Sequence, residues 1–248
     1  QERSRQSLFI RNAVDLAALN DIANAPWLTV VNISGHEDYA GKIDLSFVAH
    51  LPELESLSLD ELGPFDAQAI QSNSLSSLNL TNSQPNDYVF VAALENLQNL
   101  HLNNALDRLA SLPLDGLQSL TGLAIINSEI ASIAGIERLE NLNRLAITNA
   151  AVSDLAPLSG LNLTHVTLAS DKIEDLSPLG NSTEITHLVI KGSGITSLDG
   201  LSLGPSLVHI DASESELNDI SAMQTATNVE RTLFENANIT DVMSLAGK

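Results

Sequence analysis

Three histidines are the residues of this chain best suited to chemistry: His165, His187 and His209 are 22 residues apart. Imidazoles change charge near neutral pH and bind divalent metals through nitrogen. Arginines occupy the same position of the repeated pattern before and after them, and a lysine and an aspartate follow close by. The sequence therefore gives one candidate partner-binding set: Arg144, His165, His187, Lys191, His209, Asp211 and Arg231.

Three hypotheses explain this set. The first is a solvated ladder of stacked rings that binds nothing. The second is a docking stripe for an acidic partner, because arginine binds carboxylates with two parallel hydrogen bonds and imidazole makes the contact sensitive to pH. The third is a metal site. Zinc needs ligands that converge tetrahedrally, so two histidines and one carboxylate (His187, His209 and Asp211) fit better than three parallel imidazoles. The docking hypothesis requires no cofactor and no metal.

Apolar residues with a period of 21 or 22 residues must position these side chains. Around Leu145 they lie at −3, +2, +7, +10 and +13, and the same set returns around Leu123, Val166, Leu188 and Ile210. A period in the twenties with an LxxLxL core is the leucine-rich-repeat signature. The LxL pair predicts a short strand with one buried face, and the later steps of three suit a 3₁₀ or extended return.

The predicted fold class is α/β: a right-handed leucine-rich-repeat solenoid with a concave parallel β-sheet and 3₁₀ or extended convex segments, in about 10–11 coils. We predict a single domain over 1–248. Within it, 1–30 form an N-terminal partial repeat or cap, 31–120 irregular repeats and 121–248 regular repeats. A helix over part of residues 6–22 is the competing interpretation of the N-terminus. The strand positions −1, +1 and +3 should face away from the core and form the concave surface.

Two turns resemble those of a known family. Residues 153–158 (SDLAPL) and 174–179 (EDLSPL) are similar to the turns of the bacterial internalins and related 22-residue repeats. The resemblance covers most of the chain and implies a secreted or surface recognition domain. The family's usual asparagine at +5 is largely replaced by serine, aspartate or alanine, and serine and aspartate can still accept backbone N–H groups.

A second column, at +9, carries aspartate or serine. Both residue types accept backbone N–H groups at turns, so we predict a structural role. The known calcium patterns are absent. The members of the column are Ser132, Asp154, Asp175, Ser197, Asp219 and Asp241.

Composition restricts the classes of partner that the chain can bind. The net charge of −20 opposes binding to nucleic acid and to anionic membranes, so we expect neither. There are no cysteines, which excludes disulfides and thiolate chemistry. No apolar run is long enough to span a membrane, no leader pattern opens the chain and no enzyme motif is present.

The predicted function is non-catalytic protein–protein recognition through the concave face, by an extracellular or cell-surface bacterial protein. An intracellular, cytoplasmic scaffold or regulatory protein is the alternative, and a metal- or anion-binding protein that uses the histidines is another. The last apolar position lies just before Lys248, so we also expect possible end-to-end self-association or an adjoining domain.

Overall fold

The computed structural model describes residues 6–13, 17–36, 43–104, 112–170 and 172–246. These residues fall into two compact units, with the division between Leu120 and Thr121. This division coincides with the predicted change from irregular to regular repeats. Each unit is described by itself, and the single-domain organisation stays a prediction.

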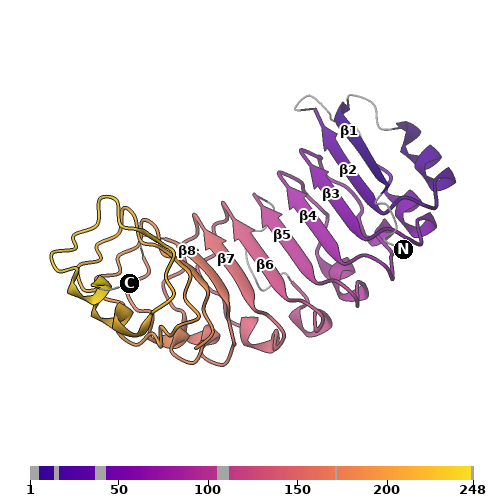
Figure 1. Cartoon of the computed structure of the whole chain (residues 1–248). Helices are drawn as coiled ribbons and strands as arrows, with labels where there is room; N and C mark the ends of the chain where they lie inside the picture. The colour runs from indigo at the N-terminus through magenta and orange to yellow at the C-terminus, as the bar shows by residue number, and fades with distance from the viewer. Residues whose placement is uncertain (1–5, 14–16, 37–42, 105–111, 171, 247–248) are drawn as a thin grey trace. The chain divides into compact units, whose positions relative to one another are not determined.

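The first unit contains strands that pair in parallel in chain order (Figure 1). The strands are β1 (Ser7–Ala13), β2 (Val30–Gly35), β3 (Ser56–Asp60), β4 (Ser77–Thr81) and β5 (Asn99–Asn103). The described 3₁₀ segments of this unit are η1 (Ala17–Asn24), η2 (Ser46–His50), η3 (Ala67–Ala69), η4 (Val89–Ala93) and η6 (Leu114–Gly116).

The second unit repeats the arrangement with more even spacing. Its strands, again parallel and in chain order, are β6 (Gly122–Ile126), β7 (Arg144–Thr148), β8 (His165–Ala169), β9 (His187–Val189), β10 (His209–Asp211) and β11 (Arg231–Leu233). Its described 3₁₀ segments are η7 (Ile136–Arg138), η8 (Ala156–Leu158), η9 (Ser177–Leu179), η10 (Ser221–Thr225) and η11 (Met243–Leu245).

The leucine-rich-repeat fold is confirmed, with parallel strands, short 3₁₀ segments and no long helix among the described residues. From β2 to β10 the apolar pair of each strand is buried between outward neighbours. In β8, for example, Val166 and Leu168 are buried while His165 is exposed and Thr167 is half-buried. Because the apolar pairs of successive strands lie in register, Leu145 aligns with Val166 and continues one apolar interior.

The +9 column has the predicted structural role. Carboxylate oxygens of Asp154, Asp175, Asp219 and Asp241 each accept the backbone N–H two residues later, at 2.8 Å. Ser132 and Ser197 do the same through their hydroxyls, at 3.2 and 3.0 Å. These bonds satisfy the first N–H groups of the turns that lead into the 3₁₀ segments.

The +4 position of most described coils adopts a left-handed backbone, and Glu61 and Glu214 hold it in two of them. Among the described residues, φ is about +50° at Asn82, Asn104, Asn127 and Asn149, and it is also positive at Gly192. Asparagine and glycine tolerate this region better than other residues. The amide of Asn149 also donates to the Oδ1 atom of Asn127, at 2.6 Å. These asparagines lie at +4, one position before the +5 column, which carries Ser83 and Ser128 after two of them.

The stretch 6–22, for which a helix was the competing interpretation, contains strand β1 over Ser7–Ala13 and the first part of the 3₁₀ segment η1 from Ala17. β1 pairs in parallel with β2, and Leu8 aligns with Val31. The 3₁₀ segment η1 follows, and residues 14–16 lie outside the described part of the chain. The pairing of β1 with β2 agrees with the repeat interpretation, and the description of 1–30 as a partial repeat or cap stays a prediction.

The last described coil leaves its apolar residues accessible. Val242 and Met243 are 60% and 75% exposed, and no residue of 227–246 is buried. No helix among the described residues has the length and apolar character that crossing a membrane requires.

We predict that Leu188→Ala lowers the free energy of unfolding by about 2–5 kcal/mol, because the removed methyl groups come from a fully buried position. Val189→Ala, on the outward face of the same strand, is the matched control and should cost about 1 kcal/mol or less. Urea titration followed by circular dichroism measures both. Equal losses would contradict the assignment of the two faces.

Removal of the carboxylate at 219 should give a pH-dependent loss of stability. Bonds from the backbone N–H and the side chain of Ser221 hold the pKa of Asp219 below its ordinary value. A lowered pKa contributes stability above the pKa of the unfolded chain, and this contribution is lost as the pH falls through the folded value. We therefore expect Asp219→Ala to destabilise the protein at pH 7 and to lose its effect at pH 2.5. Urea titrations of this variant and of Glu216→Gln, an exposed control in the same coil, test it; a pH-independent difference would count against it.

Candidate binding face of the second unit

Strand register places five of the predicted residues in one line across five strands. Arg144 pairs with His165, His165 with His187, His187 with His209 and His209 with Arg231. We call these five residues the His/Arg column. Arg144, His165 and Arg231 are exposed, and the other two are half-buried. The predicted neighbourhood of the histidines is thus present on the outward face of this unit.

The imidazole rings of the column contact one another. The rings of His165 and His187 stack, with centroids 4.5 Å apart and planes within 8°. The ring of His209 is tilted by 45° from that of His187, at 5.9 Å. Stacking follows from the spacing of neighbouring strands, which is close to 4.8 Å. The column therefore contains one tight ring pair and one looser member.

The local electrostatics keep part of the column neutral. Partial burial lowers the pKa of His165, and the positive charge of His187 and Arg144 lowers it further. Partial burial, Arg231 and His187 likewise lower the pKa of His209, against the raising effect of Asp211. Both groups thus gain their charge only at a lower pH than a free histidine.

Two residues of the predicted set form contacts outside the His/Arg column. Lys191 lies four residues beyond His187 and forms an ion pair with Glu214, with Nζ and Oε1 3.1 Å apart. The carboxylate of Asp211 accepts the backbone N–H of Ser213, at 2.9 Å. Lys191 therefore borders a different part of the surface, while Asp211 stays on the sheet face two residues along the strand from His209.

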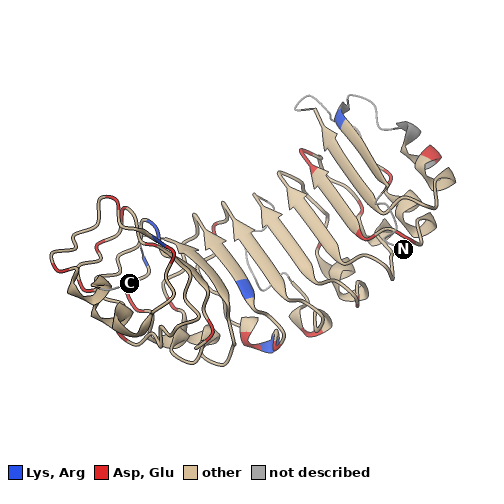
Figure 2. Cartoon of the chain, viewed as in Figure 1, with Lys and Arg blue, Asp and Glu red and all other residues tan. Residues whose placement is uncertain are grey.

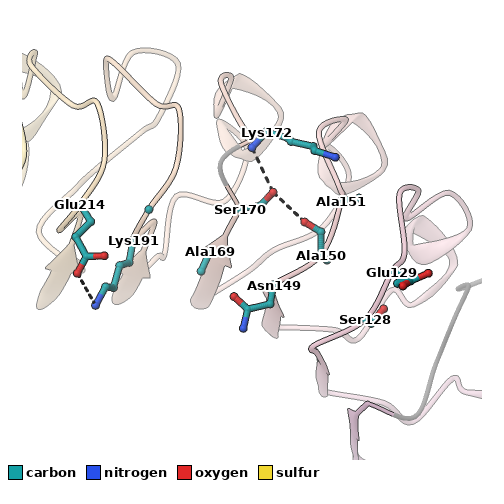
Figure 3. Close-up of a pocket in the computed structure, with 11 residues that line it drawn as sticks. Ser128, Glu129, Asn149, Ala150, Ala151, Ala169, Ser170, Lys172, Lys191 and Glu214 are labelled. Carbon is teal, nitrogen blue, oxygen red and sulfur yellow. Dashed lines mark hydrogen bonds and ion pairs between the residues drawn. The ribbon is translucent and has the colours of Figure 1, made fainter.

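A groove of about 780 Å³ lies beyond the ends of these strands. Figure 3 shows its lining, with the Lys191–Glu214 ion pair at one end and Glu129 at the other. The hydroxyl of Ser170 donates to the carbonyl of Ala150, at 3.0 Å, and accepts the backbone N–H of Lys172. Small side chains create the hollow, and its two lysines are balanced by two glutamates.

The sheet face differs in charge from the rest of the molecule. Within the described strands of the second unit, Asp211 is the only acidic residue, beside two arginines and three histidines. Figure 2 shows that the acidic residues of the described chain lie mostly in the segments between strands. In a protein of net charge −20, the His/Arg column is therefore a local concentration of basic side chains.

The metal hypothesis has not been tested by these observations. Among the residues described, no three histidine, aspartate or glutamate side chains are grouped as ligands of one ion. The alternative site at His187, His209 and Asp211 stays a hypothesis, with its aspartate already accepting one backbone hydrogen bond.

Two repeated features of the sequence were not included in the prediction of the site, although the sequence contains both. Asparagine occupies +4 in about half of the coils, one position before the +5 column at which the family's usual asparagine is largely replaced. Threonine precedes His165 and His187, and each Thr Oγ1 lies 3.0 Å from the Nδ1 atom of the following ring. A search for residues that repeat beside the histidines would have found the threonines.

The sequence matches no protein-family description and no curated protein. The fold, in contrast, matches solved structures. An internalin (inlF) from Listeria monocytogenes is similar over 98% of this chain and 84% of its own, with 21% identity and a TM-score of 0.66. The TLR13–ssRNA13 complex matches over 89% of this chain and 34% of its own, with 22% identity and a TM-score of 0.68. The plant peptide hormone receptor RGFR1, in complex with RGF2, matches over 88% and 38%, with 17% identity and a TM-score of 0.60. At these identities the comparisons show an internalin-type leucine-rich-repeat fold.

We predict that Arg144→Gln raises the pKa of His165, because the substitution removes a neighbouring positive charge that opposes protonation. The shift of the His165 Hε1 resonance with pH measures this value directly. Arg138→Gln removes the same charge from η7, away from the column, and should leave the pKa unchanged. An unchanged pKa in Arg144→Gln would contradict the described proximity.

Proposed function

We propose that the chain is a protein-recognition domain that binds an acidic segment of its partner on the outward sheet face of the second unit, with the His/Arg column at the centre. The observation that carries the proposal is the concentration of two arginines and three histidines on five paired strands of a protein with net charge −20. Local complementarity of charge directs a partner to one face and excludes others.

The two arginines supply the permanent charge of this surface. A guanidinium donates two parallel hydrogen bonds to a carboxylate, and both arginines are exposed at opposite ends of the histidines. The histidines add a condition: a neutral imidazole offers a carboxylate only one N–H donor, while a protonated one offers two and a positive charge. Affinity for an acidic partner should therefore rise as the pH falls through the imidazole pKa values.

A protein partner agrees better with this chain than a nucleic acid. The fold accommodates both classes, since one similar structure is a complex with RNA and another is a receptor complex with RGF2. A net charge of −20 repels a phosphate backbone, and its thirty-one acidic residues outnumber the eleven basic ones. A nucleic acid carries negative charge along its whole length, whereas a protein can confine its acidic residues to the segment that meets the His/Arg column, so the charge balance favours a protein ligand.

We also propose that the domain acts at the surface of a bacterial cell or outside it. The similarity to the fold of a Listeria internalin supports this location. An intracellular scaffold built from the same repeats is the competing proposal. Immunodetection in the medium and in cell fractions of the source organism separates the two: protein confined to the cytoplasm would exclude the surface role.

An acidic peptide tests the binding face. We predict that a fluorescein-labelled peptide of ten glutamates binds the protein at pH 6 and low salt, and that the double variant Arg144→Gln/Arg231→Gln weakens binding about fivefold or more, since two exposed ion pairs are lost. Fluorescence anisotropy measures the affinity, with a labelled single-stranded RNA of the same length as a second probe.

Lys172→Gln/Lys191→Gln is the matched control, because it removes the same charge from the strand-end groove and leaves the column intact. An equal loss in both double variants would show that only net charge matters and would overturn the proposed face. Tighter binding of the RNA than of the peptide would overturn the choice of a protein ligand.

A further inference from the structure

The last coil of the described chain (yellow in Figure 1) exposes positions that form the interior of the coil before it. In that preceding coil the six interior side chains are at most 2% exposed: Leu207, Ile210, Ala212, Leu217, Ile220 and Met223. In the last coil the same six positions, which we call the end face, are half-buried or exposed: Val229, Thr232, Phe234, Ile239, Val242 and Leu245. Five of the six are apolar, and nothing in the described chain covers them. An exposed apolar surface of this kind marks an interaction site.

Strand β11 borders the end face and has a neighbour on one side only. It pairs with β10, and no other strand of the described residues pairs with it. Natural edge strands are commonly blunted with lysine, proline or a bulge, because their free N–H and C=O groups otherwise pair with other chains. Residues 227–246 contain neither lysine nor proline. The backbone edge and the apolar side chains beside it are therefore open to the same partner.

We propose that a second copy of this chain covers the end face, through a two-fold contact in which the two β11 strands run antiparallel. A two-fold axis brings the same patch of both copies together, so the patch must complement itself. In an antiparallel pair the N-terminal end of one strand lies beside the C-terminal end of the other. Arg231 begins β11 and Glu235 follows its end, so these opposite charges meet twice in the dimer. The inference does not depend on what the His/Arg column binds.

The alternation of side chains restricts the register of the two strands. Directly opposite residues of an antiparallel pair project to the same side of the sheet, so outward residues must face outward residues. A pair centred on Leu233 places Arg231 opposite Glu235, and a pair centred on Thr232 places these two residues on a diagonal, which long side chains also span. Both registers therefore keep the contact between opposite charges. The end face itself carries no charged side chain.

A head-to-tail contact with the first coil of another copy fits the end face less well. In the first coil Leu19 and Ile22 are only 4% and 8% exposed, so that end of the repeat is already largely closed. The two-fold contact instead places one open interior against another. A head-to-tail contact would also repeat without closing and would form filaments. The net charge of −20 on each copy opposes association, but at physiological salt this repulsion is screened beyond about 8 Å.

Sedimentation equilibrium of the chain at physiological salt tests the contact. We expect a concentration-dependent equilibrium between monomer and dimer, without larger species. Val242→Lys should raise the dimer Kd about tenfold or more, because each dimer would then bury two unpaired ammonium groups. Met243→Lys is the matched control and should change the Kd less than about twofold. It adds the same charge at the next residue, whose counterpart in the preceding coil, Ser221, stays exposed although a coil covers that one.

Exchange of the two charges tests the two-fold geometry. Arg231→Glu and Glu235→Arg should each raise the Kd about fivefold or more, because like charges then meet in both halves of the dimer. Arg231→Glu/Glu235→Arg should return the Kd to within about twofold of the original value. Circular dichroism confirms that each variant is folded. The proposal is overturned by a monomer at every soluble concentration, by species that grow beyond the dimer, by equal effects of Val242→Lys and Met243→Lys, or by a double variant that does not restore the dimer.

Discussion

A single coil of this chain cannot bury its own apolar side chains, and this constraint organises the whole structure. The LxL pair of each strand and the apolar residues of the return segment are covered only when the next coil stacks on them. Leu145, Val166 and Leu188 consequently align on neighbouring strands, although they are 21 or 22 residues apart. The outward residues of those strands are aligned by the same stacking, whether or not they contribute to stability.

Turn chemistry keeps this stacking in register. Aspartate or serine at +9 accepts a backbone N–H at the start of the return, and asparagine or glycine at +4 permits the left-handed backbone in most coils. Where Ala150 replaces the usual acceptor at +5, the hydroxyl of Ser170 from the following coil donates to its carbonyl. Because the turns have a constant length, His165, His187 and His209 lie side by side. The candidate binding face is therefore a consequence of the repeat length.

Much of this could be predicted from the sequence, because period and alternation together determine which residues share a face. The strands, the 3₁₀ returns, the order of the His/Arg column and the role of Asp154 and its equivalents follow from spacing alone. The ion pair of Lys191 does not, since it requires the path of the turn that carries Glu214. The contacts of Thr164 and Thr186 with the Nδ1 atoms of the following rings do not follow from spacing either, since they require the side-chain rotamers.

The burial of the aromatic residues in the irregular repeats is another feature that the sequence does not determine. Six of the eight aromatic residues of the chain lie between residues 27 and 90, where the repeats are irregular. Four of them, Phe47, Phe65, Tyr88 and Phe90, are buried, whereas Trp27 is 53% exposed and Tyr39 lies outside the described residues. Composition places large side chains in these coils, but it does not say which of them remain at the surface.

Nuclear Overhauser effects between the histidine rings test the central claim most directly, with assignments from single glutamine variants. Stacked coils predict strong effects between the ring protons of His165 and His187 and weaker ones between His187 and His209, as their centroid separations of 4.5 and 5.9 Å require. No effect is expected between His165 and His209, which lie two strands apart. The absence of the His165–His187 effect in the folded protein would contradict both the shared interior and the face built on it.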